Sequence, residues 1–123
     1  MSFFNSSTNA LPPPSLEGGE VSATATGTVA FSVGPWTGFN EGDTVQLLGG
    51  FGDQVLATTV VTAAKSYFGG ASKVETVEIP APVASLRALG AGPRNVKARW
   101  VHKNGAAFGN SVSAESTVQI RGA

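Results

Sequence analysis

His102 is the only histidine in this chain of 123 residues, and cysteine is absent. Covalent catalysis needs a nucleophile beside a general base, which is most often a histidine oriented by an acid. The acids of this sequence stand singly. Glu41 and Asp43 flank Gly42 in a predicted turn, where aspartate commonly accepts hydrogen bonds from local backbone amides. We interpret His102, which follows Trp100 on one predicted strand, as a packed or rim-exposed side chain. We expect no catalytic residues and predict that the protein is not an enzyme.

Metal ligands are equally sparse. A calcium site needs several converging oxygen ligands, and Asp53 is the only further acid near the turn at residues 41–43. The lack of cysteine rules out a thiolate metal site. The glycine-rich segment 49–52 does not lead into a helix that carries Lys-Ser or Lys-Thr, as a phosphate-binding loop would. We expect neither a metal site nor a cofactor.

Lys97, Arg99 and Lys103 form a basic row on the solvent side of a strand predicted over residues 95–103. Such a row could bind an acidic protein surface or an anionic glycan, and charged outer faces also simply keep a sheet soluble. Both interpretations stay open. Nucleic acid is not an expected partner, because the formal net charge is zero and no aromatic residues interleave with the basic ones.

Trp36, Phe39 and Phe51 lie in or beside predicted loops. Aromatic rings in loops can stack on sugars, and they can equally pack beneath their own loop. These three residues are therefore candidates for glycan binding, with loop packing as the alternative. Tyr67 and Phe68, in a later glycine-rich turn, have the same two possibilities.

Alternation of apolar and polar residues predicts the elements that carry these side chains. Residues 20–33 alternate with a period of two, and Gly27 marks either a bulge or the step from one strand to the next. Further strands are predicted at residues 44–48, 54–62, 73–79, 95–103 and 111–121. Pro80 and Pro82 should end the strand before them, and residues 82–89 form the one helical segment. In the last strand, Val112, Ala114, Val118 and Ile120 should face inward, and Ser113, Glu115, Thr117 and Gln119 outward.

The resulting fold class is all-β. Six or seven short strands, with turns about every ten residues, are typical of a Greek-key sandwich. The length suits one domain, and the 16 glycines favour short strands joined by tight turns. We predict an immunoglobulin-like β-sandwich of about seven strands over residues 20–123, with one short helical turn. Immunoglobulin-like domains commonly cross between their sheets where this turn lies.

Residues 1–19 differ in composition and are predicted to form an extended N-terminal arm. Three consecutive prolines favour a polyproline II conformation. The arm could bind a neighbouring molecule, or it could fold back on its own domain as a first edge strand. Its candidate partner-binding residues are Phe3, Phe4, Leu11, Pro12, Pro13, Pro14 and Leu16.

The first residues lack the basic and apolar regions of a secretory signal, and no run of about 18 apolar residues is present. From the sequence as given, we expect neither export nor contact with a membrane.

Three stretches resemble the immunoglobulin-like repeats of bacterial surface proteins. They read PWTGFNEGDTVQLLGG, VETVEIPAPVASLRALGAG and VKARWVHKNGAAFGNSVSAESTVQI. The resemblance covers about residues 20–121, and its motifs are mainly structural. Such repeats serve in spacing and adhesion, and similar domains occur on phage capsids and tails. As an expected single domain with a predicted arm and no expected signal peptide, this chain would depart from the surface-protein pattern.

The resemblance and these departures imply a non-enzymatic structural protein of a phage virion. We expect a capsid decoration protein on the outside of the shell. Its arm and sandwich would bind the major capsid protein, another virion protein or copies of itself. The alternative is a surface or tail module that binds host-cell glycan, located at the bacterial cell surface.

Overall fold

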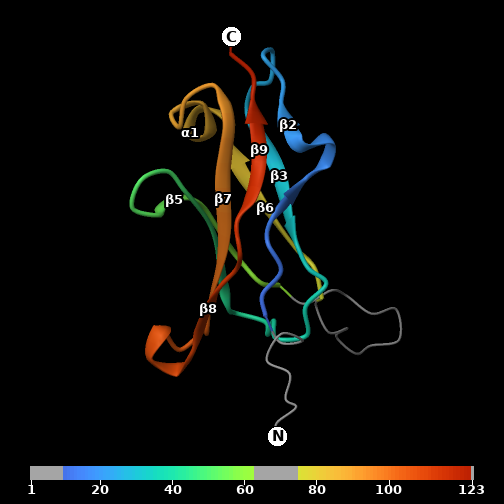
Figure 1. Cartoon of the computed structure of the whole chain (residues 1–123). Helices are drawn as coiled ribbons and strands as arrows, with labels where there is room; N and C mark the ends of the chain where they lie inside the picture. Colours follow the sequence, from blue (N-terminus) through green and yellow to red (C-terminus); the bar gives the residue numbers. More distant parts are fainter. Residues whose placement is uncertain (1–9, 63–74, 123) are drawn as a thin grey trace, which may run out of the picture.

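The computed structural model describes residues 10–62 and 75–122. Within these ranges the chain forms short strands, one short α-helix and two 3-10 turns (Figure 1). The elements are β1 (Ser15–Leu16), η2 (Glu17–Gly19), β2 (Glu20–Val21), β3 (Thr28–Val33), β4 (Thr44–Gly49), β5 (Gln54–Val60), β6 (Val77–Pro82), α1 (Val83–Arg87), β7 (Gly92–Val101), η3 (Ala106–Phe108), β8 (Asn110–Val112) and β9 (Ser116–Ile120).

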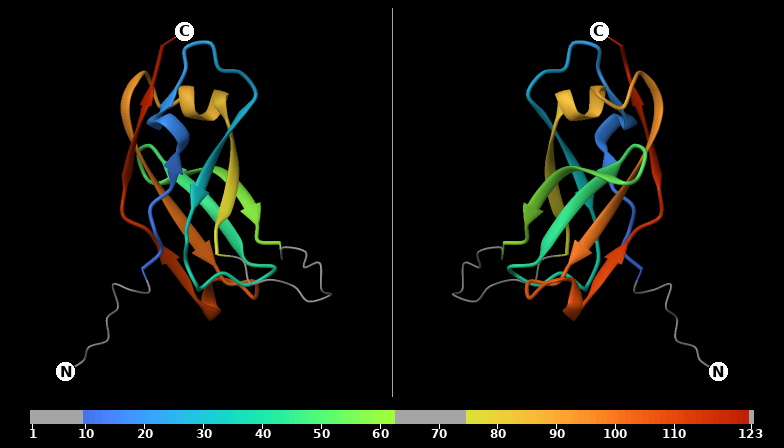
Figure 2. Two further views of the ribbon diagram at one scale, coloured as in Figure 1. Left: turned by 90° about the vertical axis from the view of Figure 1, so that its right-hand side faces the viewer. Right: turned by 90° about the vertical axis from the view of Figure 1, so that its left-hand side faces the viewer.

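Two sheets pack face to face as a sandwich (Figure 2). The smaller sheet has the order β1-β3-β6, and the larger has the order β2-β9-β7-β4-β5, with β8 paired to β7. The chain crosses between the sheets from β3 to β4, from β5 to β6, and from β6 through α1 to β7. This is the connectivity of an immunoglobulin-like Greek-key sandwich, so the predicted fold class is confirmed.

The core lies between the sheets and consists of alternate apolar residues on each strand. Val45 and Leu47 on β4 face Ile79 on β6 from the opposite sheet, and all three are fully buried. Leu86 from α1 joins the same cluster. The predicted period-two alternation therefore places the core correctly in the central strands. The helical segment predicted at residues 82–89 is confirmed as α1, which begins directly after β6.

The alternation over residues 20–33 does not form one strand. β2 pairs with β9 in the larger sheet and β3 with β6 in the smaller, so the chain changes sheets between them. Gly27, at φ 74°, lies in the loop between β2 and β3. Of its two predicted roles, a bulge or the step from one strand to the next, the second is therefore the one observed. Ala23 is exposed in the intervening loop, although its odd position predicts an inward side chain. A sequence period cannot show where a strand leaves its sheet.

Two predictions about strand ends are wrong. β6 runs through Pro80 to Pro82, because it lies at the edge of the smaller sheet, where a residue without an N–H need not break the ladder. The last predicted strand is split into β8 and β9. The split reverses the side-chain phase, so that Val112 and Ala114 are exposed and Ser113 is buried.

The described part of the N-terminal arm packs on its own domain. β1 pairs with β3 in an antiparallel manner, and β2 pairs with β9 in a parallel manner. Leu11 is 3% exposed and belongs to the core, and the Ser116 hydroxyl donates to the carbonyl of Pro14. Of the arm's candidate residues, Leu11 and Pro14 are buried, Pro12 and Leu16 are half-buried, and Pro13 is exposed. Phe3 and Phe4, like Tyr67 and Phe68, lie outside the described residues.

Candidate binding surface on the larger sheet

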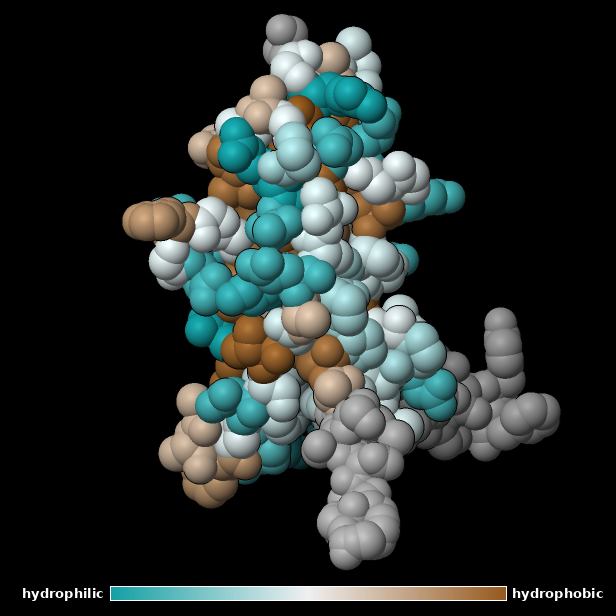
Figure 3. Space-filling view, in the orientation of Figure 1, coloured by the Kyte–Doolittle hydropathy of each residue, from teal (hydrophilic) through white to brown (hydrophobic). Residues whose placement is uncertain are grey.

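The large hydrophobic side chains that stand exposed in the described residues come from two hairpins of the larger sheet. Phe51, Val55 and Val60 belong to the β4–β5 hairpin, and Phe108 and Val112 belong to the β7–β8 hairpin. Figure 1 shows the two hairpin tips projecting toward the same side of the molecule. In Figure 3, brown groups mark both tips, and a further brown patch lies near β8. Hydrophilic groups separate these brown groups in Figure 3, but the exposed apolar side chains gather on one side of the molecule and mark a candidate binding surface.

Strand register places three of these valines on one face. Val60 pairs with Thr44 and Val55 pairs with Leu48, both on β4, and a register shift between Leu47 and Leu48 lets the two valines share a side. Val112 pairs with Arg99 on β7. Since directly paired residues point to the same side of a sheet, all three valines lie on its outer face.

Arg99 lies on the same outer face, beside Val112 and two strands away from Val55 and Val60. Its Nε donates to Oε1 of Gln46, at 2.8 Å, and Gln46 is its cross-strand partner on β4. No carboxylate in the described residues forms an ion pair with Arg99. We call the outer surface formed by Val55, Val60, Arg99 and Val112 the hairpin face. It carries three half-exposed valines, with the polar side chains of Gln46 and Thr58 between them, and the positive charge of Arg99 has no acidic partner among the described residues.

The structure separates the other two predicted basic residues from Arg99. Lys97 Nζ lies 3.2 Å from Oδ1 of Asp53 in an ion pair. Lys103 follows the end of β7 at Val101, so it lies in the hairpin loop and not on the strand. The predicted basic row is therefore reduced to Arg99, because one lysine is neutralised and the other has left the sheet.

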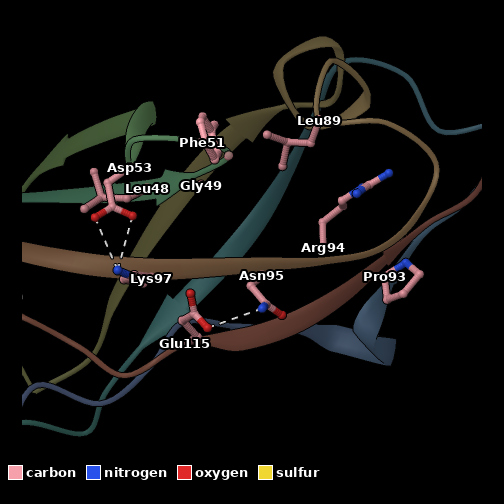
Figure 4. A pocket seen from close by; sticks show the side chains of 11 residues that line it. Leu48, Gly49, Phe51, Asp53, Leu89, Pro93, Arg94, Asn95, Lys97 and Glu115 are labelled. Carbon is pink, nitrogen blue, oxygen red and sulfur yellow. Dashed lines mark hydrogen bonds and ion pairs between the residues drawn. The ribbon is translucent and has the colours of Figure 1, made fainter.

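A groove of about 450 Å³ adjoins the upper end of the hairpin face (Figure 4). It lies between the β4–β5 turn, Leu89 after α1, and the outer side of β7. Leu48 forms part of its lining and is 1% exposed, although it points away from the sandwich core. Asn95 Nδ2 donates to Oε1 of Glu115 at 3.3 Å on one side of the groove.

Trp36 and Phe39 belong to the core, not to an open aromatic site. Trp36 is 9% exposed and Phe39 1% exposed, and their ring centroids lie 4.9 Å apart. The Trp36 ring also meets Trp100 at 5.4 Å and lies directly against Gly38, where a Cβ would come within 2.4 Å of it. Of the three aromatic candidates, only Phe51, at 98% exposed, presents an accessible ring.

Asp43 is a buried carboxylate that holds this aromatic cluster. It is 0% exposed, and Oδ2 accepts hydrogen bonds from the Asn40 amide at 2.9 Å and from Trp100 Nε1 at 2.6 Å. Oδ1 accepts from the Lys103 amide at 2.9 Å. The predicted hydrogen bond to a local amide is confirmed for Asn40. The two distant donors, Trp100 and Lys103, could not be predicted from the sequence around Asp43.

His102 packs against two aromatic rings of its own β7–β8 hairpin, and among the described residues it forms no ion pair with an acid. Its ring centroid lies 6.2 Å from that of Trp100 and 6.0 Å from that of Phe108, and Nδ1 accepts from the Asn104 amide at 3.0 Å. Within the described ranges, no three His, Asp or Glu residues are grouped to hold a metal ion.

Arg87 is a structural cation that sequence reasoning missed. Its Nη1 donates to the Arg121 carbonyl at 2.7 Å, and its Nη2 donates to the carbonyls of Ser22 and Ala23 at 2.8 and 3.0 Å. The guanidinium thus joins α1 to the β2–β3 loop and to the end of β9. Its position in the last turn of a short helix was the only available signal, and such a position is usually solvated.

Comparison with family models, with curated proteins and with solved structures found no match to this chain. Across residues 10–62 and 75–122, no helix has the length and apolar character needed to span a membrane.

Proposed function

We propose that this protein is a non-enzymatic structural component of a phage virion, a decoration protein that docks on the capsid shell. The hairpin face is the observation that supports docking. Val55, Val60 and Val112 are about half exposed on the same outer face as Arg99, on a sheet that packs on the core beneath it. Exposed apolar side chains together with polar groups and an arginine resemble the composition of protein–protein interfaces, where arginine is enriched.

The capsid as the partner is supported by the resemblance of the three sequence stretches to domains found on phage particles. A fold alone does not define a function, so docking is inferred from the side chains of the hairpin face. The face predicts a partner surface that has apolar side chains opposite the valines and a carboxylate opposite Arg99, since a buried, unpaired guanidinium would be costly. The major capsid protein is the proposed owner of that surface.

The described part of the arm is occupied within its own domain. Residues 10–19 supply Leu11 to the core and β1 to the smaller sheet. Removing residues 1–19 would therefore disrupt the domain as well as any contact with a partner. A truncation that tests the arm must stop at residue 9.

The test is binding to viral particles. Particles from cultures producing the virus that encodes this chain are purified on a density gradient and analysed by mass spectrometry. Particles stripped of the protein are then mixed with purified wild-type chain, with Val112→Asp, with Arg99→Glu and with Ala84→Asp. Ala84 is exposed on α1, away from the hairpin face, and Ala84→Asp changes the charge by the same amount as Val112→Asp.

We expect the chain to be present in the particles and to bind again after stripping. Val112→Asp and Arg99→Glu should each weaken binding at least about tenfold, because each places a negative charge at the interface, whereas Ala84→Asp should bind as wild type does. Absence of the chain from the particles would overturn the virion proposal. Equal binding by all variants would exclude the hairpin face as the docking surface.

Glycan binding is the second candidate function, and one observation favours it. Phe51 is almost fully exposed at the rim of a polar groove. Trp36 and Phe39 do not support this candidate, because both rings are buried.

A further inference from the structure

We propose that the groove beside the β4–β5 turn binds a neutral saccharide, with the Phe51 ring as its stacking platform. The groove develops the second candidate function, glycan binding, and does not depend on docking to a capsid. Its volume of about 450 Å³ falls within the range of roughly 300–1,000 Å³ that is usual for small-ligand sites.

The groove has an apolar side and a polar side. Figure 4 shows Phe51 and Leu89 along one side, with Asn95 and Glu115 across from them. The Lys97–Asp53 ion pair closes one end. A sugar ring presents an apolar C–H face and a set of hydroxyl groups, so it needs this combination of an aromatic surface and polar groups.

The turn that carries Phe51 is held in place by its own backbone and by Lys97. Gly50 and Gly52 have φ values of 74° and 79°, a conformation that glycine adopts without strain. Asp53 follows at φ 53°, where aspartate is tolerated, and both of its carboxylate oxygens lie 3.2 Å from Lys97 Nζ. The ion pair therefore fastens the turn to β7 and leaves the ring pointing outward.

The charges lining the groove favour an uncharged ligand. Arg94 and Lys97 are matched in number by Asp53 and Glu115, so the lining has no net charge. Arg94 is also engaged locally, because its Nε and Nη2 donate to the carbonyls of Gly90 and Ala91 at 3.1 and 2.9 Å. A strongly anionic glycan would meet both carboxylates, and a cationic ligand would meet both basic side chains.

The hydrogen-bonding groups also match hydroxyl groups, which both donate and accept. Glu115 and Asp53 offer acceptor oxygens, Lys97 offers donors, and Asn95 offers both. The Asn95 Oδ1 accepts from the Thr117 hydroxyl at 2.9 Å, while its Nδ2 faces Glu115. This network fixes the orientation of the Asn95 amide before a ligand arrives.

The test is an array of neutral, sialylated and sulfated glycans, probed with the full chain, followed by titration of the best neutral glycan observed by ¹H–¹⁵N NMR. The variants are Phe51→Ala and Glu115→Gln. The matched control is Phe108→Ala, which removes a 68% exposed ring from the other hairpin, outside the groove. Val112→Asp, which interferes with capsid docking, is included to separate the two proposals.

We expect binding to neutral glycans, with shift changes confined to the β4–β5 turn, β7 and Glu115. Phe51→Ala should weaken binding about tenfold through loss of the stacked ring, and Glu115→Gln should weaken it less. Phe108→Ala and Val112→Asp should bind as wild type does. Failure to bind any neutral glycan, preference for acidic glycans, or equal loss in Phe108→Ala would overturn the site, whatever the outcome with capsids.

Discussion

Asp43 links the β3–β4 loop to the β7–β8 hairpin through three N–H donors. A carboxylate can only accept hydrogen bonds, so it suits a site in which every neighbour is a donor. Trp100, one of those donors, packs against Trp36, which lies in the same β3–β4 loop as Asp43. A single buried side chain thus sets the positions of two loops and of the aromatic cluster between them.

Asp43→Ala should destabilise the domain by about 3 kcal/mol or more, because it leaves three N–H groups without their acceptor at a buried site. Asp43→Asn should cost less, since one amide oxygen still accepts, but its NH₂ group would meet another donor. Unfolding in urea, followed by tryptophan fluorescence, measures both changes.

Glu41→Ala is the control for Asp43, because Glu41 is exposed in the same turn. It should change stability by no more than about 0.5 kcal/mol. If Asp43→Ala were as mild as this control, the three hydrogen bonds could not be holding the loops.

The local part of this site was predictable and the distant part was not. An aspartate after glycine in a turn indicates an acceptor for nearby amides. The partners Trp100 and Lys103 lie 57 and 60 positions away in the sequence, and only the fold brings them close. For the same reason the sequence left two possibilities for Trp36 and Phe39, which the packing of the sandwich resolves.

The hydrogen-bond ladder of the larger sheet is interrupted between β8 and β9, and the Ser113 side chain supplies hydrogen bonds there. The Ser113 hydroxyl accepts a hydrogen bond from the Ala98 amide at 2.9 Å and donates to the Ala114 carbonyl at 2.8 Å. The Ser113 amide itself donates to the Ala98 carbonyl at 2.8 Å. Ser113 therefore satisfies both backbone groups of Ala98 where the ladder changes register, which explains why a polar residue is buried there.

Ser113→Ala should destabilise the domain by about 1–3 kcal/mol, because the buried Ala98 N–H loses its acceptor. Amide exchange of Ala98 should accelerate more than that of Val96, its buried neighbour two residues earlier on β7. Thermal unfolding and hydrogen exchange measured by NMR test the two effects.

Ser111→Ala on β8 is the comparison, since Ser111 pairs with Trp100 inside a regular ladder and no described side-chain hydrogen bond depends on it. A similar loss of stability in both variants would show that the hydroxyl of Ser113 has no special role. This element also explains the wrong phase predicted for Val112 and Ala114. Period-two reasoning assumes an unbroken strand, and a break that shifts the register reverses inside and outside.

The N-terminal segment contributes to both sheets of the whole molecule. β1 extends the smaller sheet beside β3, and β2 extends the larger sheet beside β9. Between the sheets, Leu11 closes the core. The segment from residue 10 onward is therefore an integral part of the sandwich.

Leu11→Ala should destabilise the domain by about 2–4 kcal/mol, through lost burial and the cavity left behind. Chemical denaturation measures this change. Ser15→Ala, at an exposed position on β1, should stay within about 0.5 kcal/mol of wild type. A loss below about 1 kcal/mol for Leu11→Ala would mean that the segment is held only by β1 and β2, and not by the core.

Composition and alternation determined the fold class of this protein, because a buried face imposes its period on each strand wherever the strand is regular. They also identified the candidate residues Arg99 and Phe51. Tertiary structure alone decided which candidates remain accessible. Strand pairing sets Arg99 beside the exposed Val112, an ion pair removes the free charge of Lys97, and core packing buries Trp36, Phe39 and Leu11. The exposure of a side chain and the partner it pairs with depend on residues that are distant in the sequence, so no local sequence pattern predicts them.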